Sequence, residues 1–490
     1  MRIHFHSHGR PFDLELERDH SVFHNKLIVE RNSEAFKPDL SHIYHGQLIG
    51  EPASHCFGAI RDGVFDGQIH TASDGIYYVE RANRYFPQDL NKELDDQEDN
   101  TTTTTSSSSP FHSVIYHENH LIDPFHHSRK INLGLKSPGC GISESTQSWM
   151  DSIQHSGEQQ DSSNDEQDIK QDNPVEFQET YEVENEERLK PSYKYSEQGQ
   201  NRVKRSIGSK PNPSAKKSCT LYIQTDPLFW LHIQKQEERP EKVTEEILSL
   251  IAQHVKAVNR IYSDTSFDGK YKHNGYQFAV QRINIHNDTK CGDSLSRRIS
   301  TSAAADSKAS FLQSPFVDKA EPFCTPNVDV SNFLNLHSKD NHEDFCLAYV
   351  FTYRDFTGGT LGLAWVASAS GASGGICETY KRYTENINGV HHTAKRSLNT
   401  GIITFVNYNS PVPPKVSQLT LAHEIGHNFG SPHDFPSDCR PGDPAGNYIM
   451  FASATSGNRD NNNKFSHCSK VCSIFWVHFR KRILNILLFL

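Results

Sequence analysis

The chain has 490 residues, which is enough for two or three domains of ordinary size. Hydrophobic residues make up 35 % of it and the formal net charge is −10, so we expect globular domains separated by disordered polar segments. The acidic balance, and the lack of a basic stripe interleaved with aromatic residues, exclude a general nucleic-acid binder.

The cysteines and the two ends of the chain give conflicting signals about its compartment. Ten cysteines without a CxxC zinc-ribbon pair predict a disulfide framework in an oxidising compartment, and sequons at Asn100 and Asn287 agree. Yet MRIHFHSHGRPFDLEL is no signal peptide. The last stretch is broken by Arg480-Lys481-Arg482, so it falls short of the ~18 apolar residues that span a bilayer. We therefore expect a chain that is incomplete or wrongly assembled at its start.

The first part of the chain, residues 1–140, predicts a small β-rich unit. IHFHSH and FDLELERD alternate apolar and polar residues, and GVFDGQIHTASDGIYYVE predicts a pair of strands joined by Gly/Asp turns. A low-complexity insert follows at about 94–110, and FHSVIYHENHLI then resumes an ordered pattern.

Residues 141–205 are acidic and poor in apolar side chains, which predicts a disordered linker. The linker ends in Arg-Val-Lys-Arg205 followed by Ser206, a pattern that suits a furin-type convertase, because its acidic subsites accept paired bases. The alternative is a solvated charge run. The position of the motif in a flexible segment, directly before a well-patterned domain, favours cleavage.

Residues 206–470 predict an α/β domain. The segments TLYIQT, YQFAVQRINI, FCLAYVFTYR, LGLAWVAS and GIITFVN are expected strands. Apolar residues at helical spacing predict one long helix; they are Ile247, Ile251, Val255, Val258 and Ile261. A polar insert at about 290–323 is bracketed by Cys291 and Cys324, which we expect to close it at its base.

The segment HEIGHNFGSPHD carries the clearest chemistry. His423 and His427 are four residues apart, so on a helix both imidazoles face one ion. Gly430 suits a helix end, after which the chain can turn and bring His433 in as third ligand. Three neutral imidazoles leave zinc one open position for water. The full spacing arises by chance in on the order of 10⁻³ to 10⁻⁴ of such chains.

Glu424 lies next to a ligand without being one. Its predicted role is to take a proton from the attacking water and pass it to the leaving amine of a peptide. The alternative is a surface helix with incidental histidines.

With these residues in place, the sequence resembles the metzincin metallopeptidases, whose signature is H-E-x-x-H-x-x-G-x-x-H. The trailing Asp434 is similar to the ADAM branch, and Met450 in GNYIMF falls where the methionine turn of metzincins belongs. CLAYVFTYRDF, LGLAWVAS, GGICE, SLNTGIIT and NNNKFS resemble the Kuzbanian-type ADAM sheddases.

This resemblance implies an α/β metzincin protease domain at 206–470, with a mixed, mostly parallel sheet and an active-site helix, preceded by a β-rich prodomain at 1–140. It also implies a zymogen in which the thiolate of Cys140 takes the fourth position on Zn²⁺. The alternative for Cys140 is a disulfide with Cys56.

Further residue roles are implied by the same resemblance. Cys219 is expected to pair with Cys346, and Cys439 with Cys468, while Cys377 either pairs with Cys472 or is left free. A substrate would add as an antiparallel strand to the edge formed by Gly362, Leu363 and Ala364.

The family implies protein substrates, namely ectodomains of type I membrane proteins of the Notch and amyloid-precursor types, and a location in the secretory pathway or at the cell surface. Residues 471–490 leave the family pattern and are expected to be an atypical tail. Two functions therefore remain open. One is a latent zinc endopeptidase, and the other is a truncated, non-catalytic chain that acts as a decoy or inhibitor of the full-length protease.

Overall fold

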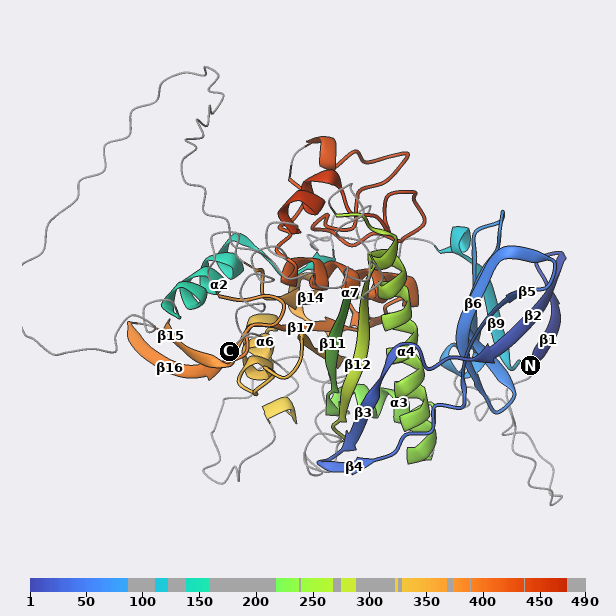
Figure 1. Cartoon of the computed structure of the whole chain (residues 1–490), viewed down its shortest axis with the longest axis horizontal. Helices are drawn as coiled ribbons and strands as arrows, with labels where there is room; N and C mark the ends of the chain where they lie inside the picture. The colour runs from blue at the N-terminus through green and yellow to red at the C-terminus, as the bar shows by residue number, and fades with distance from the viewer. Residues whose placement is uncertain are drawn as a thin grey trace, which may run out of the picture. The chain divides into compact units, whose positions relative to one another are not determined.

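The computed structural model describes the chain in segments with gaps between them (Figure 1). The described residues are 1–86, 111–121, 138–157, 217–237, 239–267, 275–287, 322–324, 328–367, 373–387, 389–435 and 437–473. Met1–Gln160 and Lys216–Leu490 form one compact unit, which contains every element described below. The expected cleavage site at Arg205 and Ser206 lies outside the described residues, as do most of the linker and most of the insert at 290–323.

An eight-stranded sheet, called here the central sheet, has the strand order β10-β14-β17-β13-β11-β12-β3-β4. Its strands are β10 (Gly139–Cys140), β14 (Thr360–Ala364), β17 (Thr400–Thr404), β13 (Leu347–Thr352), β11 (Lys217–Thr225), β12 (Tyr276–Ile285), β3 (Phe23–Arg31) and β4 (Glu34–Phe36). β17, β13, β11, β12 and β3 run parallel, whereas β14 is antiparallel to β17. Every residue of β13 and β17 is buried, as expected where helices or chain cover both faces of a parallel sheet.

Two long helices pack on the central sheet. These are α4 (Pro240–Asp264) and α7 (Pro414–Asn428) (Figure 1). Two shorter helices in the same part of the molecule are α3 (Pro227–Gln234) and α6 (Val330–Ser338). The predicted helical spacing is confirmed in α4, where Ile247, Ile251 and Val255 are fully buried. α7 is buried along its whole length, so it is held as a central element of the core. The fold is thus the α/β arrangement expected of a metzincin-type metallopeptidase.

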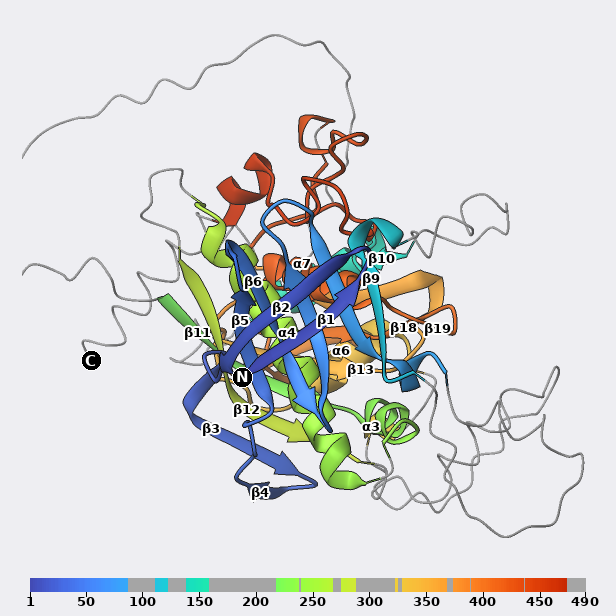
Figure 2. The same ribbon diagram turned by 90° about the vertical axis from the view of Figure 1, so that its right-hand side faces the viewer.

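A second, antiparallel sheet of seven strands, called here the N-terminal sheet, has the order β1-β2-β5-β6-β7-β8-β9. Its strands are β1 (Arg2–Ser7), β2 (Arg10–Arg18), β5 (Ile43–Leu48), β6 (Glu51–Arg61), β7 (Val64–His70), β8 (Ile76–Arg81) and β9 (Ser113–His117). Asp62 and Gly63 join β6 to β7 with positive φ at both residues, as a tight two-residue hairpin requires. Figure 2 looks onto this sheet, with α4 behind it.

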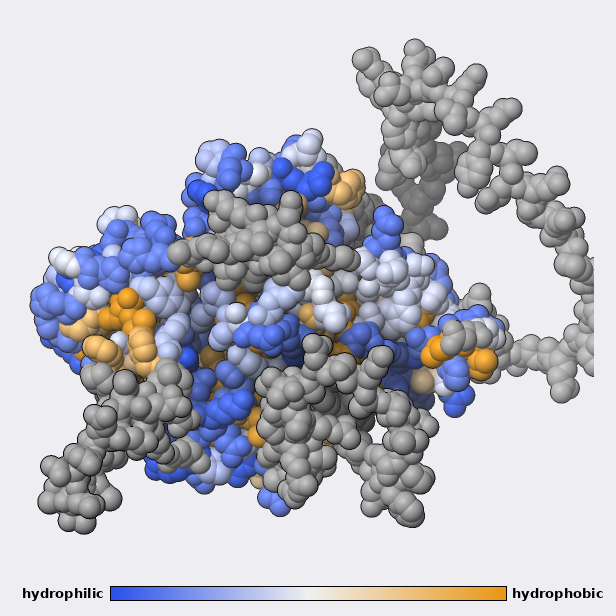
Figure 3. Space-filling model, turned by 180° about the vertical axis from the view of Figure 1, so that it is seen from behind, coloured by the Kyte–Doolittle hydropathy of each residue, from blue (hydrophilic) through white to orange (hydrophobic). Residues whose placement is uncertain are grey.

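The remaining elements are short. They are the strands β15 (Lys381–Ile387), β16 (Val390–Arg396), β18 (Val406–Asn407) and β19 (Ser410–Pro411), the helix α2 (Glu144–Ser156), and the 3-10 turns η1 (Ala82–Arg84), η3 (Glu118–His120), η6 (Pro322–Cys324), η7 (Thr357–Gly359) and η8 (Ser437–Cys439). None of the described helices has the length and apolar character that a bilayer span requires. The surface that Figure 3 shows is mainly hydrophilic, with small apolar patches.

The structure corrects the expected start of the disordered linker. Residues 144–156, placed in that linker by composition, form α2, whose N-terminus is capped by the Ser143 hydroxyl. The helix buries Met150 and Ile153 on one face and exposes polar residues on the other. One narrow apolar face is enough to dock a helix, and an average over the segment hides it.

The β-rich unit expected over residues 1–140 also contributes a strand to the central sheet. β3 leaves the N-terminal sheet and pairs in parallel with β12, with Ile28 opposite Arg282 and Val29 opposite Ile283. Val29 is fully buried there. The N-terminal residues therefore extend the central sheet as well as forming a sheet of their own.

Candidate metal centre

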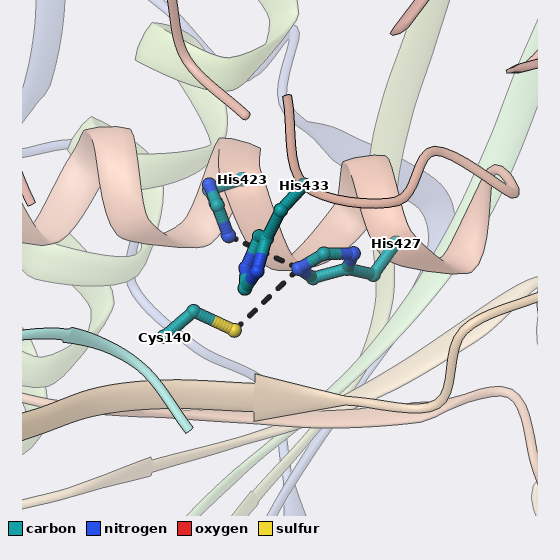
Figure 4. A group of neighbouring side chains, drawn as sticks. All are labelled: Cys140, His423, His427 and His433. Atoms are coloured by element: carbon teal, nitrogen blue, oxygen red, sulfur yellow. Dashed lines mark hydrogen bonds between the residues drawn. The ribbon is translucent and has the colours of Figure 1, made fainter. Parts of the chain in front are cut away.

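Three imidazoles converge at the C-terminal half of α7 (Figure 4). His423 and His427 project from one face of the helix, and their Nε2 atoms are 3.0 Å apart. The helix ends at Asn428, and Gly430 adopts a φ of 86°, which lets the chain turn back. His433 then reaches the same point, with its ring centroid 5.3 Å from that of His423 and 4.9 Å from that of His427.

Backbone carbonyls fix the orientation of two of these rings. Nδ1 of His423 donates to the carbonyl of Ile449 at 2.6 Å, and Nδ1 of His427 donates to the carbonyl of Ser431 at 2.8 Å. Each Nε2 is thereby left as a lone-pair donor directed at the common centre, which is the usual support of metal-binding histidines. Because these partners are main-chain atoms, no side-chain motif in the sequence could have revealed them.

The charge state of the three imidazoles suits metal binding. Burial lowers the pKa of His423 to about 4 and that of His433, with help from His423, to about 3. Burial and the two neighbouring imidazoles hold the pKa of His427 well below its ordinary value. All three are therefore neutral ligands near pH 7, as zinc requires.

Cys140 completes the group from the opposite side (Figure 4). Its Sγ lies 3.5 Å from Nε2 of His427, and the ligand atoms of Cys140, His423, His427 and His433 all lie within 4.8 Å of one another. Nε2 of His433 is buried and has no hydrogen-bond partner in the described part of the chain. Three neutral imidazoles and a thiol, with a buried nitrogen that lacks a partner, fit a tetrahedral zinc ion.

Glu424 is fully buried beside this group. The Cys140 thiol donates to Oε2 of Glu424 at 3.8 Å, and Oε1 has no partner among the described residues. Burial raises the pKa of Glu424 to about 8. The strand β14 passes so close that a Cβ on Gly362 would lie 2.7 Å from Oε1 of Glu424, so glycine is needed at this position.

Met450 lies under α7, in the place where the sequence predicted a methionine turn. It is fully buried, and a Cβ on Gly426 would lie 2.5 Å from its Sδ. The carbonyl of Met450 accepts a hydrogen bond from the backbone N–H of Asp434 at 2.9 Å. The Asp434 side chain in turn accepts from the Ser466 and Ser469 hydroxyls. This chain of contacts ties the segment that carries His433 to the floor of the site.

The expected substrate edge is already paired on both sides in this structure. Leu363 and Ala364 pair with β17, and on the other side β10 runs parallel to β14, with Cys140 opposite Gly362. The backbone N–H of Gly141 donates to the carbonyl of Gly362 at 2.8 Å. The stretch that carries Cys140 therefore occupies the edge where the sequence predicted a substrate strand.

Two disulfides link the predicted pairs, Cys219 with Cys346 and Cys439 with Cys468. Cys324 is also disulfide-bonded, while its expected partner lies outside the described residues. The alternative that paired Cys140 with Cys56 is wrong, because both are free thiols and Cys56 is buried within the N-terminal sheet. A bond between Cys377 and Cys472 is not formed.

The sequence matches a known metallopeptidase family and resembles curated proteins over most of its length. Residues 241–475 match the family described as "Metallo-peptidase family M12B Reprolysin-like". The chain is 39 % identical over 477 residues to a "Disintegrin and metalloproteinase domain-containing protein 10 homolog" of Caenorhabditis elegans, which covers 95 % of this chain and 44 % of the relative. It is 38 % identical over 478 residues to "Disintegrin and metalloproteinase domain-containing protein 10" of Homo sapiens, which covers 96 % of this chain and 50 % of the relative. The chain thus spans about half the length of the curated relatives it matches.

Proposed function

We propose that this chain, which belongs to the ADAM metallopeptidases, is a metalloendopeptidase of the Kuzbanian type, and that it is a zinc-dependent sheddase made as a latent zymogen. The observation that carries the proposal is the convergence of three neutral imidazoles, a cysteine thiol and a buried glutamate at one point. Its substrates would be the ectodomains of membrane-anchored proteins, of the Notch and amyloid-precursor types. Its place would be the secretory pathway or the cell surface.

The metal ligands in this proposal are His423, His427 and His433. Zinc, when bound, would supply a Lewis acid that polarises the scissile carbonyl and lowers the pKa of water. Glu424 would accept a proton from the attacking water and pass it to the leaving amine, because it lies beside the ligands and beside the substrate edge. Burial raises its pKa to about 8 in this latent arrangement, and a bound cation together with entering water would favour the ionised carboxylate that this role needs.

Latency would come from two features of one segment. The thiol of Cys140 points into the metal site, where a thiolate would exclude water. The backbone of residues 139–141 pairs with Gly362 of β14, so a substrate strand cannot add there. A furin-type convertase that cleaves between Arg205 and Ser206 would begin activation by cutting the chain after this segment.

The alternative of a non-catalytic decoy is not favoured by this geometry. A decoy needs neither an ordered set of three imidazoles nor a buried carboxylate beside them. Backbone carbonyls fix His423 and His427 here, and both rings and Glu424 are buried.

The decisive experiment uses the full chain, loaded with zinc and incubated with a furin-type convertase, on quenched peptides from ectodomain cleavage regions. We expect cleavage that requires the convertase and is lost in Glu424→Ala or after chelation. Cys140→Ala should cleave slowly without the convertase, because the thiol is gone while the backbone pairing with β14 remains. Cys56→Ala, which removes the other free cysteine of the N-terminal region, should stay latent. A folded, zinc-loaded and convertase-cut chain that stays inert on every peptide after its N-terminal fragment has been removed would refute the catalytic proposal.

A further inference from the structure

A second group of potential metal ligands lies where α6 ends and the chain enters β13. The ligand atoms of His337, Asp340 and His342 lie within 4.8 Å of one another. His337 is in the last turn of α6, and the chain then reverses, with the backbone N–H of Asp340 donating to the carbonyl of His337 at 3.4 Å. This tight turn brings three side chains from six consecutive residues into one small volume.

His337 is the least satisfied side chain of the group. It is fully buried, and its ring nitrogens make no hydrogen bond of good geometry among the described residues, although the backbone of Ala348 lies close to the ring. A buried polar group without a hydrogen-bond partner lowers the stability of the fold by about 1–3 kcal/mol, so binding of an ion by this imidazole would be favourable.

The ring of His342 makes a hydrogen bond to a backbone carbonyl, as metal-binding histidines commonly do. Its Nε2 donates to the carbonyl of His337 at 3.2 Å, and its backbone N–H donates to the Ser397 hydroxyl at 2.9 Å. The ring centroid lies 4.6 Å from that of His337 and 4.8 Å from that of Tyr222. A metal-binding histidine commonly donates its other ring N–H to a backbone carbonyl, and here this bond leaves Nδ1 for an ion.

Asp340 provides the opening to solvent. It is exposed, whereas both histidines are buried, so its carboxylate reaches solvent while lying within 4.8 Å of a ligand nitrogen of each ring. The Ser397 hydroxyl donates to the backbone carbonyl of Asp340 at 2.9 Å and holds the turn in place. An ion could therefore enter from the side of the carboxylate and meet the imidazoles behind it.

We propose that His337, Asp340 and His342 form a structural zinc site, separate from the site on α7. Two imidazoles and one carboxylate suit zinc, whereas magnesium and calcium prefer oxygen ligands only. The ion would join the end of α6 to the turn that leads into β13, close to the Cys219–Cys346 disulfide. This proposal does not depend on the proposed peptidase activity.

The test uses the full chain carrying His423→Ala and His427→Ala, so that the site on α7 cannot contribute, and titrates it with Co²⁺ as a coloured substitute for zinc. We expect one Co²⁺ per chain with visible absorption bands of nitrogen and oxygen coordination. His342→Asn should abolish the bands, and Asp340→Asn should weaken binding by about tenfold or more. His391→Asn, at an exposed histidine of β16, is the matched control and should change nothing.

A second measurement guards against misfolding of these variants. The zinc content of the chain with an intact α7 site should be two ions, and Asp340→Asn alone, at an exposed position, should reduce it to one after dialysis. Co²⁺ bands that persist in both His342→Asn and Asp340→Asn, or a zinc content unaffected by Asp340→Asn, would overturn the proposal. Peptide cleavage is no part of either readout, so a failure of the proposed function would not be mistaken for a failure here.

Discussion

Replacing Glu246 by glutamine tests how the N-terminal sheet is held on the rest of the molecule. Glu246 lies on α4 with 2 % of its side chain exposed, and its carboxylate contacts the guanidinium groups of Arg61 and Arg84 from the N-terminal region. Arg61 is equally buried, at 1 %. Burial alone would raise the pKa of Glu246, but Arg61 and Arg84 outweigh it and hold the pKa at about 2, so the group is ionised.

The size of the expected destabilisation depends on the charges of Arg61 and Arg84 that remain when glutamine replaces Glu246. Removing one partner of a buried ion pair leaves an uncompensated charge and costs about 3–5 kcal/mol. Here Asp66 remains 2.5 Å from Arg84 and offsets part of the charge, so we expect about 3 kcal/mol. The neighbouring Glu245 is the matched control, because its ion pair among the described residues is with Lys242 of the same helix, where both side chains are partly exposed. Glu245→Gln should cost less than about 1 kcal/mol.

The assay is urea denaturation of the full chain, followed by circular dichroism, for the wild type and both variants. We expect Glu246→Gln to lower the free energy of unfolding about three times as much as Glu245→Gln, or more. Equal and small effects of the two substitutions would refute the view that this buried network holds the N-terminal sheet in place.

Two other predictions follow from packing and from titration. Gly426→Ala would push a Cβ against Sδ of Met450, so we expect a loss of about 1–3 kcal/mol, seen as a lower thermal midpoint and partly restored by adding Met450→Ala. The rings of His55 and His70 stack, with centroids 4.1 Å apart, beside Arg260 of α4. Burial, and secondly the charge of Arg260, lowers the pKa of His55 to about 4. Burial, together with His55 and Arg260, lowers the pKa of His70 well below 6.5. Because both pKa values are depressed on folding, their contribution is complete above pH ~6.5 and is lost as the pH falls towards 4. The urea midpoint should therefore drop between pH 7.5 and 5 in the wild type, and less steeply in His70→Gln; parallel slopes would contradict this.

The sequence predicted best what depends on neighbours along the chain. The spacing of His423 and His427 places both rings on one face of α7, and Gly430 supplies the turn that brings His433 back. The long helix α4 was equally visible, because its apolar residues repeat over several turns.

The features that could not be predicted from the sequence depend on residues that lie far away in the chain. The pairing of β3 with β12 joins residues more than 250 positions apart, and no local pattern specifies it. The contacts of Glu246 with Arg61 and Arg84 are of the same kind, since exposed and buried charges look alike in a sequence. α2 was missed because only Met150 and Ile153 mark its buried face.

The weakness of the β10–β14 pairing explains why the N-terminal sheet matters for latency. The segment at Cys140 is held on the site by a short run of backbone bonds, each worth about 0.5–1.5 kcal/mol. They include Gly141 to Gly362, Cys140 to Ala452 and Ala454 to Pro138. Such bonds would not keep a free peptide in place against a substrate strand. The segment belongs, however, to the chain that carries the N-terminal sheet, whose buried ion pairs raise its effective concentration at the site. A cut at Arg205 would leave both parts in one fragment, so we expect that fragment to stay bound until the ion-pair network opens. Glu246→Gln should therefore hasten its departure after cleavage.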